Sequence, residues 1–275
     1  MNKNIHADME ATEQELKWAA AIKDAAKVCA EIDADAVSDL EYLQHAIIAK
    51  EKVSKALKRI KHMQKFKQKY GIHKDGCYED AIRDLKAFEE AHPNFILALG
   101  GLETEKNTNV HVLSVDYAQF FAKNMKTEEA FQVLMRGIFY YMQACQPNVA
   151  AMRAGFVFLA NADKIGWRNF SPQAEERCAG LYSEAYPIRV NKMVMMNSSP
   201  ILRVFYNICK IFLSKKIRQT ILFCGDHKIY LQQSDYVAPT LLPTQWGGTV
   251  DGDKLQKIVR SKLDERYKAV TAFKL

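Results

Sequence analysis

Residues 186–248 decide the fold; they begin YPIRVNKMVMMNSSPILRVFYNICKIFLSKKIRQT and close LLPTQWGG. The apolar run at 192–196 predicts a strand, and Pro200 opens a helical pattern that continues through Phe212. A cluster of Lys and Arg follows at 215–218. A strand, an amphipathic helix and a basic cluster in this order indicate one unit of a sheet that is covered by helices.

The same alternation of strands and helices extends toward the amino terminus. Three further apolar runs predict strands at 95–99, 110–115 and 156–160. Thr127 is the expected N-cap of a helix at 128–144, and residues 171–185 are expected to form another helix. Strands that alternate with helices favour an α/β fold with crossover helices.

The first third of the chain has a different, helical character. Residues 10–32 are rich in Ala, Glu and Lys, and Ser38 is a suitable N-cap for a second helix. Helical spacing also fills 78–91. We therefore predict a helical domain at 1–90 and an α/β domain at 91–275 that ends in a C-terminal helix.

The positive charge of the chain is concentrated in one amphipathic helix. The formal net charge is +7, and the densest run of basic residues lies between 50 and 69. Apolar residues recur there at steps of three and four from Val53 to Tyr70, so one face is expected to be buried. The basic face is interpreted as a solvated surface, with docking on anionic lipid as the alternative. Nucleic acid is not expected as a partner because no nucleic-acid motif accompanies the charge.

In the order of its parts, the chain resembles the CRAL-TRIO lipid-binding domain family. The resemblance runs from the strand at 156–160 through the Asp163-Lys164-Ile165-Gly166 turn, Tyr186-Pro187 and the helix after Pro200 to the closing residues 242–248. It implies a mixed, mainly parallel sheet, a small preceding helical domain, and a hydrophobic pocket that a movable gate helix closes. Residues 200–213 are the expected gate, although an ordinary core helix has the same apolar stripe.

The resemblance and the period-two alternation of strand residues together assign a pocket wall. Methionine is a suitable wall residue because its side chain adapts to irregular ligands, but it also fills ordinary cores. The expected ligand-pocket residues are Phe156, Phe158, Leu181, Tyr182, Tyr186, Ile188, Met193, Met195, Val204, Phe205, Ile208 and Phe212.

Basic residues near the expected gate helix are candidates for binding a lipid headgroup or a membrane phosphate. In the phosphatidylinositol-transfer branch of the family, an acidic residue follows the Tyr-Pro pair and a lysine precedes the strand after the gate; this chain has Ile188 and Thr220 there. The chain therefore resembles more closely the tocopherol-transfer and retinaldehyde-binding branch, in which an external basic cluster contacts membrane phosphoinositides. Of that cluster, Asn191 and Thr220 are not basic here. The expected headgroup or membrane-phosphate residues are Arg189, Lys192, Lys215, Lys216 and Arg218.

Motifs for catalysis or metal binding are not evident. The chain has no Gly-x-Ser-x-Gly elbow, glycine-rich phosphate loop or His-Glu-x-x-His helix. Cys224 with His227, and His73 with Cys77, supply too few ligands for a zinc site. We expect no enzymatic activity, no metal and no cofactor other than a bound hydrophobic ligand.

The cysteine spacing and the amino-terminal sequence predict a cytoplasmic location. The six cysteines have no paired spacing, which indicates a reducing compartment, and the amino terminus lacks the apolar core of a signal peptide. No apolar run approaches the roughly 20 residues that span a bilayer, so membrane association is expected to be transient and peripheral. The predicted function is a carrier that encloses one small hydrophobic molecule or phospholipid and exchanges it at anionic membranes. A lipid-sensing regulatory or protein-interaction module is the alternative, with no protein partner identified.

Overall fold

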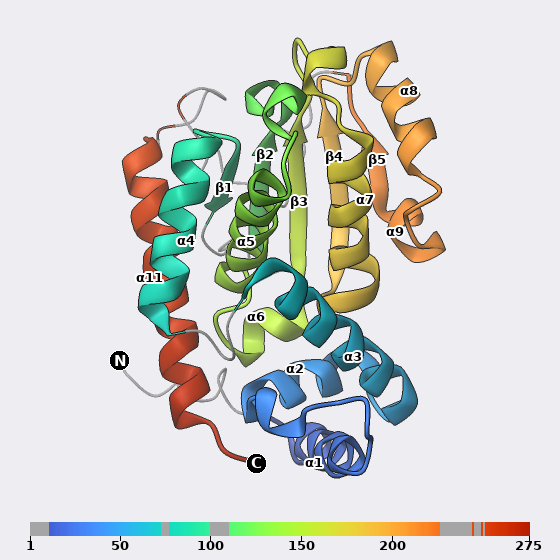
Figure 1. The fold of residues 1–275 in the computed structure, drawn as a ribbon, viewed down its shortest axis with the longest axis vertical. Coiled ribbons are helices and arrows are strands. Elements are labelled where there is room, and N and C mark those ends of the chain that lie inside the picture. The colour runs from blue at the N-terminus through green and yellow to red at the C-terminus, as the bar shows by residue number, and fades with distance from the viewer. Residues whose placement is uncertain (1–10, 73–76, 100–109, 226–243, 245–248, 250) are drawn as a thin grey trace.

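The computed structural model describes residues 11–72, 77–99, 110–225, 244, 249 and 251–275, and its centre is a five-stranded sheet (Figure 1). The strands follow chain order: β1 (Ile96–Leu99), β2 (His111–Asp116), β3 (Phe156–Asn161), β4 (Val190–Met196) and β5 (Ile221–Phe223). β1 is antiparallel to β2, whereas β2 to β5 run parallel. The expected α/β fold with a mixed, mainly parallel sheet is therefore confirmed.

Helices connect the parallel strands. The crossovers contain α5 (Glu128–Ala144) and α6 (Val149–Ala154), then α7 (Pro172–Gly180), then α8 (Pro200–Cys209) and α9 (Lys215–Thr220). Figure 1 shows α5 and α7 in front of the sheet, and α8 beside its β5 edge. Parallel strands in sequential order place their right-handed crossovers on one face, which explains this arrangement.

Within the described ranges, four α-helices precede the sheet and one follows it. They are α1 (Glu13–Lys27), α2 (Asp39–Ala49), α3 (Val53–Tyr70), α4 (Tyr78–Ala91) and α11 (Gly252–Ala272). The Ser38 hydroxyl accepts a hydrogen bond from the Glu41 N–H at 3.2 Å, so Ser38 is the N-cap of α2 as predicted. On α3, Ile60, Met63 and Phe66 are buried, which confirms the amphipathic pattern.

Two apolar clusters hold these helices. α1, α2 and the first half of α3 pack together, and α6 joins them through Val149 and Met152. The second half of α3, together with α4, packs instead with the sheet and α5. α11 lies beside α4 and packs on β1 and α5 (Figure 1). The division of the chain at residue 90 stays a prediction.

Several helix boundaries differ from the sequence-based expectation. α1 ends at Lys27 rather than at residue 32. The residue that follows its end, Val28, is 86% exposed. The helix expected at 171–185 changes at Gly180 into one π-helical turn, closed by a 2.9 Å hydrogen bond from the Tyr186 N–H to the Leu181 carbonyl. α8 ends at Cys209, because the hydrogen-bond pattern changes there. The Phe212 N–H bonds to the carbonyl three residues earlier, on Cys209, rather than to the carbonyl four residues earlier as in an α-helix.

Candidate functional site

An apolar cavity lies between one face of the sheet and helices α5, α7 and α8. Its floor is formed by strand side chains, among them Phe158, Met193, Met195, Ile221 and Phe223. These residues share a face because Phe158 pairs with Met193, Met193 with Ile221, and Met195 with Phe223 across parallel strands. The register of the sheet thus turns a period-two pattern in three separate segments into one continuous surface.

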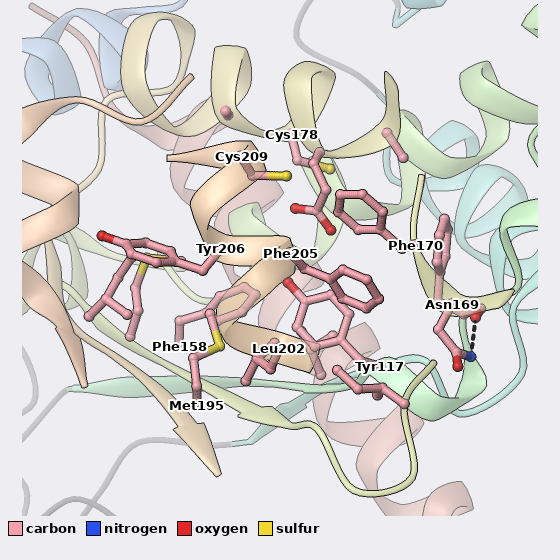
Figure 2. Close-up of a pocket in the computed structure, with 18 of the residues that line it drawn as sticks. Tyr117, Phe158, Asn169, Phe170, Cys178, Met195, Leu202, Phe205, Tyr206 and Cys209 are labelled. Atoms are coloured by element: carbon pink, nitrogen blue, oxygen red, sulfur yellow. Dashed lines mark hydrogen bonds between the residues drawn. The ribbon is translucent and has the colours of Figure 1, made fainter. Parts of the chain in front are cut away.

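Helix α8 forms a wall of the cavity and is held there by aromatic contacts. Leu202, Phe205 and Cys209 face the cavity, in agreement with their helical spacing. The Phe205 ring stacks on the Phe170 ring with centroids 4.2 Å apart (Figure 2). The Trp167 ring meets the Phe205 ring edge-on at a centroid distance of 5.1 Å. Both partners belong to the segment that leads from β3 into α7, so α8 is fixed against a different crossover connection.

The cavity is narrow in this conformation. Its volume is about 100 Å³. A cavity of roughly 150 Å³ accommodates benzene, and drug-sized ligands occupy pockets of roughly 300–1,000 Å³. A lipid-sized molecule therefore requires wall side chains to rotate or α8 to move outward.

The expected pocket residues fall into three groups. Phe158, Tyr182, Met193, Met195 and Phe205 line the cavity. A second group is buried in the core without lining the cavity: Phe156, Leu181, Tyr186 and Ile188. A third group, Val204, Ile208 and Phe212, points elsewhere.

Geometry explains the third group. At 100° per residue, Val204 lies on the side of α8 opposite the cavity-facing Leu202 and Cys209, and Ile208 lies on a flank of the helix; their exposed fractions are 46% and 39%. Phe212 lies beyond the end of the helix. Assignment of these residues to ligand contact stays a prediction.

The cavity also contains a polar group that the sequence did not single out. Glu175 on α7 lines it, and among the described residues no side chain forms a hydrogen bond or ion pair with this carboxyl group. Burial raises the pKa of Glu175 to about 7. The next residue, Glu176, is exposed. A single acidic residue on an amphipathic helix gives no sequence signal, because only the helix rotation decides which of two adjacent glutamates faces inward.

A cluster of basic side chains lies outside the cavity. Burial lowers the pKa of Lys216, and so do the neighbouring positive charges of Lys55, Arg189 and Arg59. Arg59 donates hydrogen bonds to the carbonyls of Ser183 and Tyr186 at 3.2 and 3.3 Å, which ties α3 to the π-helical turn. The structure thus joins two predicted residues, Arg189 and Lys216, to two from the basic helix.

The remaining predicted basic residues are dispersed. Lys192 is exposed on β4, and Lys215 and Arg218 are exposed on α9. Sequence reasoning treated the basic helix and the residues near the gate as separate features. Their proximity depends on tertiary packing between segments more than 120 residues apart.

Some of the motifs noted in the sequence cannot be placed. His73, His227 and most of the closing stretch 242–248 lie outside the described residues. Among the helices that the structure describes, none combines the length and apolar composition that a membrane span requires.

Comparison with known proteins agrees with this geometry. The CRAL/TRIO domain matches residues 99–248, more than half of the chain. The protein therefore belongs to the CRAL/TRIO domain family. The crystal structure of Sfh5 superposes with a TM-score of 0.59 over 90% of this chain and 91% of that chain. At 11% identity, this likeness shows a shared fold and nothing more.

Curated relatives match over a shorter segment. Tyrosine-protein phosphatase non-receptor type 9 of Mus musculus is 23% identical over 126 residues, which are 46% of this chain and 21% of the phosphatase. The Homo sapiens protein of the same name is 23% identical over 121 residues, 44% of this chain and 20% of that protein. The matched segment thus spans about a fifth of these relatives.

Proposed function

We propose that the protein encloses one hydrophobic molecule in the α7–α8 cavity and exchanges it at anionic membranes by outward movement of α8. The main support for this proposal is that α8 has apolar side chains both toward the cavity and toward solvent. Its inner side closes an apolar cavity, and its outer side exposes Val204 and Ile208, with Ile211 74% exposed just beyond. A helix with apolar groups on both sides loses no burial when the outer side enters a membrane interface and the inner side releases a ligand.

The basic cluster supports docking on anionic lipid. Burial lowers the pKa of Lys216, and the positive charges of Lys55, Arg189 and Arg59 lower it further; a lipid phosphate would relieve this repulsion. The departure from the phosphatidylinositol-transfer pattern at Ile188 and Thr220 favours the tocopherol-transfer and retinaldehyde-binding branch. All six cysteines are free thiols, which agrees with a cytoplasmic location. We propose no catalytic role, since the phosphatases match only over a fifth of their length.

Native mass spectrometry with solvent extraction tests the ligand. The expected result is one co-purifying hydrophobic molecule per chain, and a chain that binds none of a panel of lipids contradicts the proposal. Transfer is tested separately with a fluorescent lipid moved from donor to acceptor vesicles. Wild type should accelerate transfer, and Phe205→Asp should abolish ligand retention because it places a charge in the apolar wall.

A vesicle-binding measurement tests the basic cluster. Each basic residue near an anionic surface contributes about 1 kcal/mol, so Lys55→Gln combined with Lys216→Gln should weaken binding to phosphatidylserine vesicles roughly 25-fold. The control is Lys254→Gln with Lys257→Gln, which removes the same charge from the exposed side of α11. Equal losses in both double variants would show that only net charge matters.

The alternative is a lipid-sensing module that does not transfer its ligand. It is favoured by the curated relatives, in which the matched segment is a fifth of a longer protein named as a phosphatase. Ligand binding without accelerated transfer between vesicles would support this alternative.

A further inference from the structure

We propose that Glu175 is the recognition group of the cavity and that the enclosed molecule is an uncharged lipid alcohol, whose hydroxyl group hydrogen-bonds to the Glu175 carboxyl group. This inference rests on the proposed ligand-binding function and specifies the chemistry of the ligand. It starts from a buried polar group that packing alone does not explain, in walls that are otherwise almost entirely apolar.

The position of the carboxyl group is the first step. Glu175 is half-buried, yet burial alone raises its pKa to about 7. Both facts hold together if the accessible part of the side chain faces the enclosed cavity rather than bulk water, and Glu175 indeed lines that cavity. A carboxyl group without a hydrogen-bond partner in an apolar environment costs free energy, because it has lost its hydrogen bonds to water. A ligand with a complementary polar group recovers that free energy.

The surroundings of Glu175 are the second step. Four titratable groups interact with it from four elements: Tyr117 after β2, Cys178 on α7, Tyr182 in the π-helical turn and Cys209 on α8. Burial raises the pKa of each, so all four are neutral near pH 7. Figure 2 shows Cys178 and Cys209 on the same side of the cavity. Among the described residues, no cation faces Glu175. Arg177, two residues on, forms an ion pair with Glu128 instead.

These surroundings select among ligand chemistries. A phosphate or carboxylate beside Glu175 would meet a like charge with no cation to offset it. A pure hydrocarbon would leave the carboxyl group unpaired. An ammonium group would pair only with the ionised form, which the apolar walls disfavour. A hydroxyl group donates to the carboxylate and accepts from the protonated acid, so it satisfies Glu175 in both states that coexist near pH 7.

A matched series of long-chain ligands tests this selection. The probes are 1-hexadecanol, its methyl ether, hexadecane and palmitate, each measured by displacement of a fluorescent lipid from the full chain. At pH 9, where Glu175 is ionised, we expect wild type to bind hexadecanol at least tenfold more tightly than the ether, because the ether has no donor for the carboxylate. In Glu175→Met, which has a similar length without polar oxygens, the alcohol and the ether should bind equally.

Two further variants separate recognition from a general effect on the fold. Glu175→Gln always supplies a donor, which an ether oxygen accepts as well as a hydroxyl does, so it should reduce the preference for the alcohol and bind palmitate more tightly than wild type does. Glu176→Met, one residue away on the exposed side of α7, should leave every affinity unchanged. Equal binding of alcohol and ether by wild type, or a preference that survives in Glu175→Met, overturns the inference and leaves ligand binding standing. Failure of all four probes to displace the bound fluorescent lipid likewise overturns the inference alone, whereas failure of the fluorescent lipid itself to bind contradicts both proposals.

Discussion

The rings of Phe170 and Phe205 lie nearly parallel, with 5° between their planes and 4.2 Å between their centroids (Figure 2). Phe205 belongs to α8, and Phe170 precedes α7, so this stack joins the two helices that close the cavity. Aromatic pairs contribute about 0.5–1.5 kcal/mol beyond the area they bury. This contact therefore contributes to holding α8 against the segment that precedes α7.

Removal of the stack should loosen α8 selectively. In Phe170→Ala, we expect amide hydrogen exchange of residues 200–209 to be about tenfold faster, since roughly 1.4 kcal/mol corresponds to a factor of ten in an opening equilibrium. Val204→Ala is the control, because Val204 lies on the exposed side of the same helix. Mass spectrometry of exchanged peptides measures the effect. Equal protection in both variants would show that Phe170 does not hold the helix.

The close approach of α4 and α5 depends on Gly137. A Cβ atom at this position would lie 2.1 Å from Cγ of Phe88, which is fully buried and packs edge-on against Tyr141. Gly137→Ala should therefore lower the free energy of unfolding by about 1–3 kcal/mol. Gly180→Ala is the matched control, because its Cβ would meet no atom within 4 Å and its φ is −59°. It should be neutral or stabilising by about 0.4–1 kcal/mol in urea unfolding.

A buried hydrogen-bond network joins α2, the segment between α5 and α6, and the C-terminal helix α11. Arg266 donates to the Gln44 side-chain oxygen at 2.8 Å and to the Gln146 carbonyl at 2.7 Å. Arg266→Met leaves both acceptors buried without this donor, so we expect a loss of about 3 kcal/mol in the free energy of unfolding. Arg260→Met on the same helix removes a partly exposed ion pair with Glu89 and should cost about 1 kcal/mol or less. Similar losses in the two variants would contradict the role of burial.

The contact between α1 and α6 should depend on pH. Arg153 donates hydrogen bonds to the Glu15 carboxylate, one of them from Nε at 2.8 Å. This hydrogen bonding holds the pKa of Glu15 below its usual value, although burial opposes the shift. A lowered folded-state pKa stabilises the protein above the unfolded-state pKa of about 4.3, and this stabilisation is lost as pH falls through the folded-state pKa. Glu15→Gln should therefore cost about 1–3 kcal/mol at pH 7 and much less near pH 3. Chemical unfolding at several pH values measures this difference; a pH-independent cost would indicate packing rather than charge.

The sequence pattern predicted most elements with small errors at their ends. Strong signals, such as the Thr127 cap before α5 and the spacing of apolar residues on α3, gave correct helices. The short helices α6 and α9 were missed because six residues are too few for a periodic pattern. The end of α8 was misplaced, since an apolar run continues past the residue where the hydrogen bonding changes.

The sequence by itself determined the fold class, the family and the presence of one apolar stripe per strand and helix, because periodicity and local caps are properties of neighbouring residues. Only the tertiary structure decided which stripes face the same space. Strand register places Phe158 beside Met193, helix rotation turns Glu175 inward and Val204 outward, and packing of α3 brings Lys55 to Lys216. Those relationships depend on contacts between segments far apart in the chain, which no local pattern encodes.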